Sequence, residues 1–205
     1  MYARSTTVHA QTDAIDAGTM YMQARVMPAL MEMDGWAGLS LIVDRDTGRC
    51  IVTTSWADEE AMLAGEQSVE SIRRDAADKF QGTVEKVERW QIAAMHREHR
   101  AAEGCGVRCT WLRVPDTDRA VEAFRTRVLP RAEEMDGFCS GSFFLDRAGG
   151  RACSAIAWDS LAIMAGNRDE MRQLLEGVTG ELGAEVLEVA EFELAIAHLR
   201  VPELV

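Results

Sequence analysis

Apolar and polar residues change their spacing several times along this chain, and each spacing predicts a different element. Runs rich in β-branched residues at positions 5–8 and 107–114 predict two short strands. Apolar residues three and four positions apart follow each run and predict helices, the first over 14–33 and the second from a cap at Asp116 or Thr117. Each copy of the pattern therefore begins with a strand and a helix.

Both of these helices carry the same two signals. Gly35 and Gly137 stand just beyond the last apolar position, where a left-handed residue that ends a helix is favoured. Pro28 and Pro130 lie inside the helical stretches, where a missing amide and a ring clash disturb the hydrogen-bond ladder. The sequence predicts that both helices are kinked or divided near these prolines.

Two alternating segments joined by a tight turn come next in each copy. The turns at 44–48 and 146–150 are rich in Asp and Gly, which favour hairpin geometry. The predicted hairpin strands are 36–43 with 49–56, and 138–145 with 151–158. A second helical region is predicted up to about residues 80 and 182, and a long last strand over 84–95 and 186–197.

The most informative pattern is that the chain repeats itself. Residues 25–96 align with 127–198 at a constant offset of 102 positions without a gap, and about a quarter of the pairs are identical. The period is too long for a solenoid repeat, so it indicates a duplicated small domain. The predicted domains are residues 1–99 and 100–205, with a short charged linker over 97–104.

The element order β-α-β-β-α-β, occurring twice, predicts an α+β fold with two ferredoxin-like repeats. Each repeat forms a four-stranded antiparallel sheet with helices on one face. The other sheet face would be left uncovered, and two repeats can bury these faces against each other. Burial of these two apolar sheet faces is therefore a physical reason for the duplication.

Composition narrows the class of partner. The formal net charge is −12, which repels the phosphates of nucleic acids and anionic membrane surfaces, so neither is a predicted partner. No window approaches 18 consecutive apolar residues, and a soluble, cytoplasmic protein is expected. The five cysteines include no CxxC pair; Cys105 and Cys109 lack a second ligand pair nearby, so the sequence predicts neither a disulfide framework nor a metal site.

Short motifs around the hairpins resemble those of the antibiotic-biosynthesis-monooxygenase domain, of the dimeric α/β-barrel superfamily. The residues are Met33-Asp34-Gly35-Trp36 with 56–62, and Met135-Asp136-Gly137-Phe138 with 158–164. Residues 191–205 also resemble an actinobacterial family of such tandem proteins. The resemblance implies an intramolecular barrel of eight strands with a pocket between sheet and helices in each half. Members include cofactor-independent monooxygenases of polycyclic phenols and haem-degrading enzymes.

Trp56 and Trp158 match the family tryptophan at the end of the third strand, which the resemblance implies lines the pocket. A flat indole suits an apolar planar ligand. The alternative is that each indole only packs strand against helix. Both interpretations stay open.

His96 and His198 end the apolar rows of the two last strands. Counting by twos places Trp90 on the same face as His96, which makes this indole a further candidate ligand contact. An imidazole at a pocket rim can act as a base near neutral pH or ligate iron. The alternative is a histidine that is hydrogen-bonded at the strand end or between the halves.

Asn167 and Arg108 are candidate polar pocket residues, and Arg4 is another possible source of positive charge. Haem-degrading relatives use an Asn on the first strand and a His about ten residues after the Trp, and both are missing here. No phosphate loop, Ser-His-Asp pattern or HExxH motif occurs, so no cofactor is predicted.

Two hypotheses follow from the sequence. The first is a cofactor-independent oxygenase for a planar aromatic or quinone-type compound, with His96 and His198 as candidate bases. The alternative is a non-catalytic ligand-binding or stress-related protein with the same barrel, and haem binding is a third. The expected partner is a small hydrophobic or aromatic molecule. A further homo-oligomer is compatible with each.

Overall fold

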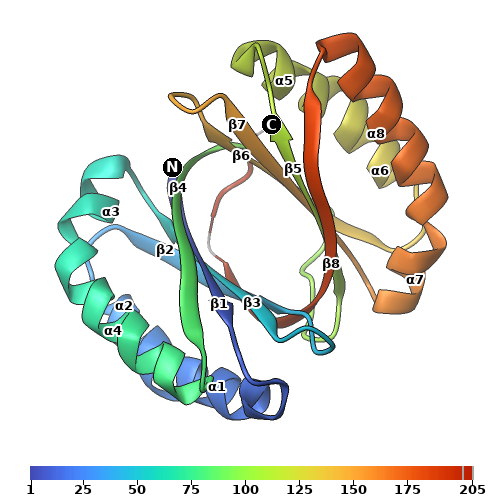
Figure 1. The fold of residues 1–205 in the computed structure, drawn as a ribbon. Coiled ribbons are helices and arrows are strands. Elements are labelled where there is room, and N and C mark those ends of the chain that lie inside the picture. The colour runs from blue at the N-terminus through green and yellow to red at the C-terminus, as the bar shows by residue number, and fades with distance from the viewer. Residues whose placement is uncertain (200, 205) are drawn as a thin grey trace. The chain divides into compact units, whose positions relative to one another are not determined.

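The computed structural model describes residues 1–199 and 201–204. It is an α+β fold in which the order β-α-β-β-α-β occurs twice (Figure 1). The strands are β1 (Tyr2–His9), β2 (Trp36–Val43), β3 (Arg49–Trp56), β4 (Thr83–Arg97), β5 (Gly106–Arg113), β6 (Phe138–Asp146), β7 (Arg151–Trp158) and β8 (Glu185–Leu199). The helices are α1 (Ile15–Tyr21), α2 (Met27–Met31), α3 (Glu59–Ala64), α4 (Glu66–Lys79), α5 (Thr117–Ala123), α6 (Leu129–Glu133), α7 (Leu161–Gly166) and α8 (Arg168–Leu182).

The eight strands are hydrogen-bonded in the closed order β1-β3-β2-β8-β5-β7-β6-β4, which is the antiparallel barrel that the resemblance implied. The chain divides into two compact units. Unit 1 comprises Met1–Trp90 and Leu194–Val201, and unit 2 comprises Gln91–Glu193 and Pro202–Val205. The strands β4 and β8 therefore begin in one unit and end in the other.

The hairpins form as predicted. In unit 1, β3 pairs with both β1 and β2, and in unit 2, β7 pairs with both β5 and β6. Gly48 and Gly150 close the turns with φ of 78° and 59°, a conformation that favours glycine. The side chain of Asp44 accepts hydrogen bonds from the backbone amides of Asp46 and Thr47, which explains the repeated aspartate as turn chemistry.

The first helical region of each copy is divided, as the prolines predicted. A π-helical turn at Met22–Val26 separates α1 from α2, and another at Phe124–Val128 separates α5 from α6. Pro28 and Pro130 follow directly at the second residue of α2 and α6. Because proline has no amide hydrogen and its ring displaces the carbonyl four residues earlier, a wider turn before it relieves the conflict.

The second helical regions are each divided once. Gly65 separates α3 from α4, and Asn167 separates α7 from α8. Asp58 and Ser160 cap α3 and α7, since their side chains accept hydrogen bonds from the amides of Ala61 and Ile163. These caps fix the direction of the chain directly after each hairpin.

Each unit has its own hydrophobic core between the sheet and the helices that cover one of its faces (Figure 1). Trp56, Phe80 and Leu30 are among the most buried side chains of unit 1, and Trp158 and Phe143 are buried in unit 2. Burying such aromatic side chains contributes a large share of the apolar area removed from water.

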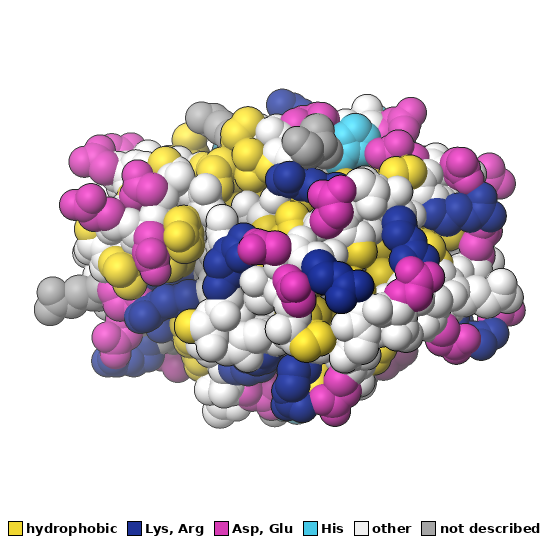
Figure 2. Space-filling model, turned by 90° about the horizontal axis from the view of Figure 1, so that it is seen from above, with side chains coloured by type: hydrophobic (Ala, Val, Ile, Leu, Met, Phe, Trp, Pro, Cys, Tyr) yellow, Lys and Arg dark blue, Asp and Glu magenta, His cyan; other side chains and the backbone are white. Residues whose placement is uncertain are grey.

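On the face shown in Figure 2, acidic and basic side chains are interspersed, and no basic stripe is seen there. That arrangement agrees with the acidic composition of the chain. Within the described residues, no helix has both the length and the apolar character that crossing a membrane requires.

Candidate ligand-binding pockets

Each unit contains a pocket between the sheet and the helices that cover it. Both pockets are partly open to solvent, and the empty space in and directly outside them is about 480 Å³ in unit 1 and about 550 Å³ in unit 2, open solvent included. The unit 1 pocket is lined by Arg4, Thr6, Val8, Met22, Val26, Leu30, Val52, Thr54, Val69, Ile72, Arg73, Ala76 and Phe80. Both pockets have mostly apolar walls, which is typical of small-molecule sites.

The two pockets occupy the same place in the repeat. The lining residues Met22 and Val26 correspond to Phe124 and Val128 of the unit 2 pocket, at the offset of the sequence repeat. These four side chains come from the π-helical turns before the prolines. The disturbed helices therefore shape one wall of each pocket.

An arginine of the first strand lines each pocket: Arg4 is buried in unit 1 and Arg108 is largely buried in unit 2. In unit 1, Tyr2 of β1 pairs with Trp56, and in unit 2, Gly106 of β5 pairs with Trp158, so Arg4 and Arg108 occupy equivalent positions two residues further along. Arg4 is only 1% exposed although it is a charged residue. Such burial is rare unless the charge is paired or used for binding.

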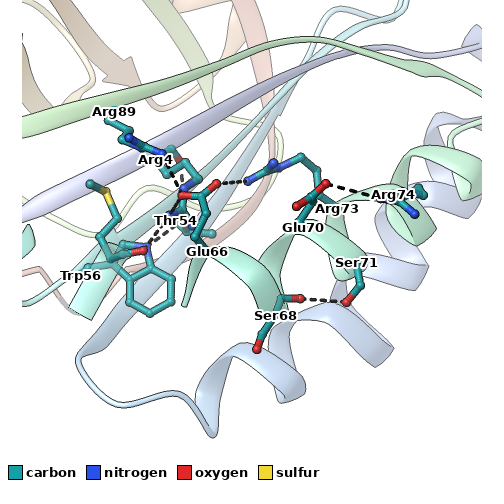
Figure 3. Close-up of polar contacts among 11 residues, drawn as sticks. Arg4, Thr54, Trp56, Glu66, Ser68, Glu70, Ser71, Arg73, Arg74 and Arg89 are labelled. Carbon is teal, nitrogen blue, oxygen red and sulfur yellow. Dashed lines mark hydrogen bonds and ion pairs between the residues drawn. The ribbon is translucent and has the colours of Figure 1, made fainter. Parts of the chain in front are cut away.

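In unit 1, Arg4 belongs to a cluster of four charged side chains (Figure 3). Its Nη2 donates to the Met62 carbonyl oxygen at 2.6 Å and to Glu66 Oε2 at 2.5 Å. The same carboxylate accepts from Arg89 at 3.2 Å, and Arg73 Nη2 lies 3.7 Å from its other oxygen. Three guanidinium groups thus surround one carboxylate.

The pairing leaves guanidinium nitrogens of unit 1 without partners. Nε and Nη1 of Arg4, and Nε and Nη2 of Arg73, are buried and have no hydrogen-bond partner among the described residues. Both residues line the pocket. Buried donors of this kind carry a free-energy penalty, and a hydrogen-bond acceptor that reached them would remove it.

The charges around Glu66 alter the pKa values of the cluster. Burial opposes ionisation of Glu66, but Arg4, Arg89 and Arg73 outweigh it and hold the pKa of this carboxyl below its usual value. Burial, with Arg73 and Arg89, lowers the pKa of Arg4, although Glu66 acts in the opposite direction. The cluster therefore has an excess of positive charge that a further anion would relieve.

Unit 2 has a related cluster in which the charges at two equivalent positions are exchanged. Arg108 Nη1 donates to Glu191 Oε1 at 2.8 Å, and Arg168 contacts the same carboxylate at 2.5 Å. At the repeat offset, Glu66 corresponds to Arg168 and Arg89 corresponds to Glu191. In unit 1 the acidic residue is on α4 and the arginine is on β4, whereas in unit 2 the arginine is on α8 and the acidic residue is on β8. Both units have an arginine on the first strand.

Hydrogen bonds from Arg168, followed by the charges of Arg168 and Arg108, lower the pKa of Glu191 despite its partial burial. The unit 2 pocket has Leu175 where unit 1 has Arg73. The two pockets thus share an apolar body and a cationic end, but unit 1 has one more positive charge.

Trp56 and Trp158 lie in the cores and are not among the residues that line the two pockets. Both indoles are fully buried, and Trp56 Nε1 donates to Thr54 Oγ1 at 3.2 Å. Trp158 Nε1 has no partner among the described residues, because Ile156 replaces Thr54 in unit 2. Their packing role is visible in the structure, whereas ligand contact stays a prediction.

His96 and His198 lie away from the lining of both pockets, each in the unit built mainly from the other sequence copy. His96 contacts Glu133 at 3.0 Å and Glu203 at 3.3 Å through its two ring nitrogens. It also stacks on Phe138, as His198 stacks on Trp36 at 5.6 Å between ring centroids. A catalytic role for either imidazole stays a prediction.

Trp90 and Asn167 make local polar contacts. Trp90 Nε1 donates to Ser5 Oγ at 2.8 Å, and the indole is 4% exposed. Asn167 Nδ2 donates to the Asp136 carbonyl oxygen at 3.2 Å. Neither residue lines the pockets, so of the seven residues selected from the sequence only Arg108 does.

The sequence indicated Arg4 only as a possible source of positive charge, and it did not indicate Arg73, Glu66 or Glu191 as site residues. Arg4 contacts Glu66 from 62 positions away, and no spacing rule connects two such residues. The repeat does contain information on this contact, because the charges at positions 66 and 89 are exchanged at the equivalent positions 168 and 191. A paired exchange of this kind indicates contact.

Two mycobacterial proteins are similar to the chain over its full length. The uncharacterised protein Rv2557 of Mycobacterium tuberculosis is 51% identical over 207 residues, and the match covers 100% of this chain and 92% of that protein. The uncharacterised protein Rv2558 of the same organism is 53% identical over 208 residues, covering 100% of this chain and 88% of that protein. No protein-family model matches the chain.

Solved structures with low sequence identity have the same fold. A putative monooxygenase from Lactobacillus acidophilus has a TM-score of 0.62 at 9% identity, with 94% of this chain and 92% of that chain covered. An anthrone oxidase-like protein has a TM-score of 0.61 at 13% identity, with 100% and 95% covered. A Listeria monocytogenes protein described as related to antibiotic biosynthesis monooxygenases has a TM-score of 0.53 at 7% identity, with 95% of both chains covered.

Proposed function

We infer the function from the pockets, because the chain belongs to the family of the uncharacterised mycobacterial proteins Rv2557 and Rv2558, whose names state no activity. We propose that each unit binds a small, planar, mostly apolar organic molecule that carries one negatively charged oxygen group. The apolar part occupies the space between sheet and helices, and the charged oxygen faces Arg4 in unit 1 and Arg108 in unit 2.

The observation that carries this proposal is the arginine of the first strand that lines an apolar pocket in both units, buried in unit 1 and largely buried in unit 2. Exchange of the sign of two neighbours has kept an excess of positive charge in each cluster. Arg4 lines the pocket and has buried donors without a hydrogen-bond partner, and a guanidinium is suited to a carboxylate or phenolate.

Calorimetric titration with naphthoate and with the neutral naphthalenemethanol tests the proposal. Naphthoate is expected to bind more tightly to the wild type, and the preference is expected to fall in Arg4→Met and Arg108→Met. A hydrogen bond to a charged group contributes about 1.5–3 kcal/mol, which corresponds to a loss of roughly tenfold or more. Arg74→Met, on an exposed face of α4, is the matched control. Equal affinity for both compounds would contradict the proposal.

A second candidate is oxygenation of a bound phenol or anthrone without a cofactor. The anthrone oxidase-like protein that shares the fold favours it, as does a cation that would hold the enolate oxygen of a deprotonated anthrone. In this reaction, O2 replaces the two hydrogens of the anthrone methylene by one oxygen, and the second oxygen leaves as water.

Oxygen uptake with anthrone separates this candidate from binding alone. Uptake that falls in Arg4→Met but not in Arg74→Met would support it, and His96→Ala with His198→Ala tests the predicted bases. Absence of uptake by wild-type protein that binds naphthoate would leave binding as the function. Haem is not proposed, since no histidine is among the residues that line either pocket.

A further inference from the structure

Three side chains that can ligate a metal lie together at one end of the unit 2 sheet, and a fourth lies beside them. The three are His99, Cys139 and Asp159, whose ligand atoms all lie within 4.8 Å of one another. The fourth is Cys105, which is a neighbour of Cys139, but its sulfur lies outside this group of three.

Strand pairing explains why residues so far apart in sequence meet. Gly106 and Phe138 both pair with Trp158, so Cys105 and Cys139 lie beside Asp159, the first residue after β7. The register shift between Phe138 and Ser140 leaves Cys139 as the extra residue of a bulge. Bulges redirect a side chain, and they often occur near functional sites.

The backbone also holds His99 at this position. β4 pairs with β6 up to Arg97 opposite Ser140, and the amides of Glu98 and His99 then donate to the Cys139 carbonyl oxygen at 2.9 and 3.4 Å. His99 Nε2 lies 2.9 Å from Asp159 Oδ1, and Cys139 Sγ lies 3.3 Å from the same oxygen. Three ligand atoms are therefore brought together at the ends of three strands, β4, β6 and β7.

The equivalent place in unit 1 has none of these groups. Strand pairing and the repeat offset match Cys105, Cys139, Asp159 and His99 to Met1, Ala37, Ala57 and Val201. Unit 1 has the same bulge, between Trp36 and Gly38, but Ala37 occupies it. Because the bulge exists without a thiol, turn and strand geometry do not require Cys139. The four groups are a property of unit 2 alone.

We propose that His99, Cys139 and Asp159 bind a zinc ion and that the side chain of Cys105 turns toward the ion as the fourth ligand of a tetrahedral site. Two thiolates, one imidazole and one carboxylate match the ligands and the number that structural zinc sites use. On binding, each thiol releases a proton and zinc takes the resulting thiolate, so metal uptake is coupled to the loss of two protons. Four protein ligands leave no open position, so the metal ties the end of β4 to the sheet rather than catalysing a reaction.

The exposed side chains of the site would let an ion enter from water. Cys105 and Cys139 are 2% and 0% exposed, whereas the side chains of His99 and Asp159 are 45% and 49% exposed. The thiols are thus protected from solvent, and the two outer ligands can close over an ion that arrives from water. The proposal does not depend on what the pockets bind.

Cobalt substitution of the reduced full-length protein tests the site. After removal of metal with a chelator, one equivalent of Co²⁺ is expected to give the thiolate-to-cobalt charge-transfer band in the near ultraviolet and the intense visible bands of tetrahedral cobalt. Zn²⁺ is expected to abolish these bands in equimolar amount. Proton release measured during zinc titration at constant pH is expected to approach two per chain.

The variants His99→Gln and Asp159→Asn change exposed side chains, so they are expected to keep the fold, which circular dichroism verifies. Each is expected to weaken cobalt binding by at least about tenfold. Removing a residue that binds the metal directly costs more affinity than removing one that only hydrogen-bonds to a ligand. Cys139→Ala and Cys105→Ala are expected to remove the charge-transfer band. Cys109→Ala, at a buried thiol on the neighbouring strand β5, is the matched control and keeps it.

Three results would overturn the proposal. They are a wild-type protein with no thiolate-to-cobalt band, a band that is unchanged in both His99→Gln and Asp159→Asn, and a purified protein in which Cys105 and Cys139 form a disulfide that resists reduction. Each is measured on the same protein samples, and the last is detected by thiol counting under denaturing conditions.

Discussion

At the scale of single residues, buried polar atoms show which side chains are used only for packing. Trp56 and Trp158 occupy equivalent positions and are both fully buried, but only Trp56 has a hydrogen-bond acceptor for its indole nitrogen. Arg4 is buried to the same degree and keeps unpartnered donors at a pocket. The indoles are accounted for by the core, whereas the arginine is better explained by a ligand.

The indole comparison gives a prediction with a built-in control. Trp56→Phe removes the hydrogen bond to Thr54 and is expected to lower the free energy of unfolding by about 0.5–1.5 kcal/mol more than Trp158→Phe does. In unit 2 the substitution removes a donor that had no partner among the described residues. Urea denaturation of both variants measures the difference, and equal losses would show that the hydrogen bond contributes nothing.

The lowered pKa of Glu66 predicts a pH dependence of stability. A carboxyl whose pKa is lower in the folded than in the unfolded state stabilises the fold above its usual pKa. That contribution is lost as pH falls below about 4.5, through the lower pKa of the folded state. Glu66→Gln is therefore expected to show a smaller loss of stability than the wild type between pH 7 and pH 4. Glu70→Gln, at an exposed pair with Arg74 on the same helix, serves as control and is expected to follow the wild type.

At the scale of helices and strands, the local elements could be predicted from the sequence. The unit to which the ends of two strands belong could not. The turns at Gly48 and Gly150, the prolines and the caps act within a few residues, so their signals can be read locally. The long strands β4 and β8 were predicted, but not that their ends belong to the other unit. The alternation of apolar residues is the same whichever unit a strand end joins, so the pattern contains no information about that choice.

The same limit applies to the candidate site. Arg108 was selected by residue type, and it lies in a pocket. Its counterpart Arg4 has the same sequence context as an ordinary surface arginine, because its partners Met62 and Glu66 come from α3 and α4. Long-range pairing is what turns such a residue into a buried charge, and a single sequence does not report it except through the repeat.

The exchanged signs between α4 and β4 predict a double-mutant effect. Glu66→Arg places a fourth guanidinium beside Arg4, Arg73 and Arg89 and is expected to destabilise the protein. Adding Arg89→Glu recreates the arrangement of unit 2 and is expected to recover part of the loss, with a coupling energy on the order of 1–3 kcal/mol. Chemical denaturation of the wild type, both single variants and the double variant measures it. Additive effects would contradict the inferred exchange.

At the scale of the whole molecule, an acidic chain contains two cationic pocket ends. The net charge of −12 repels anions at long range, so affinity for an anion must come from local pairing. The repeat supplies the site twice and lets the two copies differ, since unit 1 has Arg73 where unit 2 has Leu175. We expect unit 1 to show the stronger preference for an anionic ligand.

Methyl-group NMR during a naphthoate titration tests the central claim most directly, because it reports where the ligand binds. The methyl signals of Val26, Leu30 and Val69, which line the unit 1 pocket, are expected to shift on saturation. The methyl signals of Leu39 and Leu41, which lie in the unit 1 core and do not line the pocket, are expected to move much less. Arg4→Met is expected to suppress the pocket shifts at the same ligand concentration. Saturable binding that leaves the pocket methyl groups unshifted, or shifts that are the same with Arg4→Met, would contradict the account.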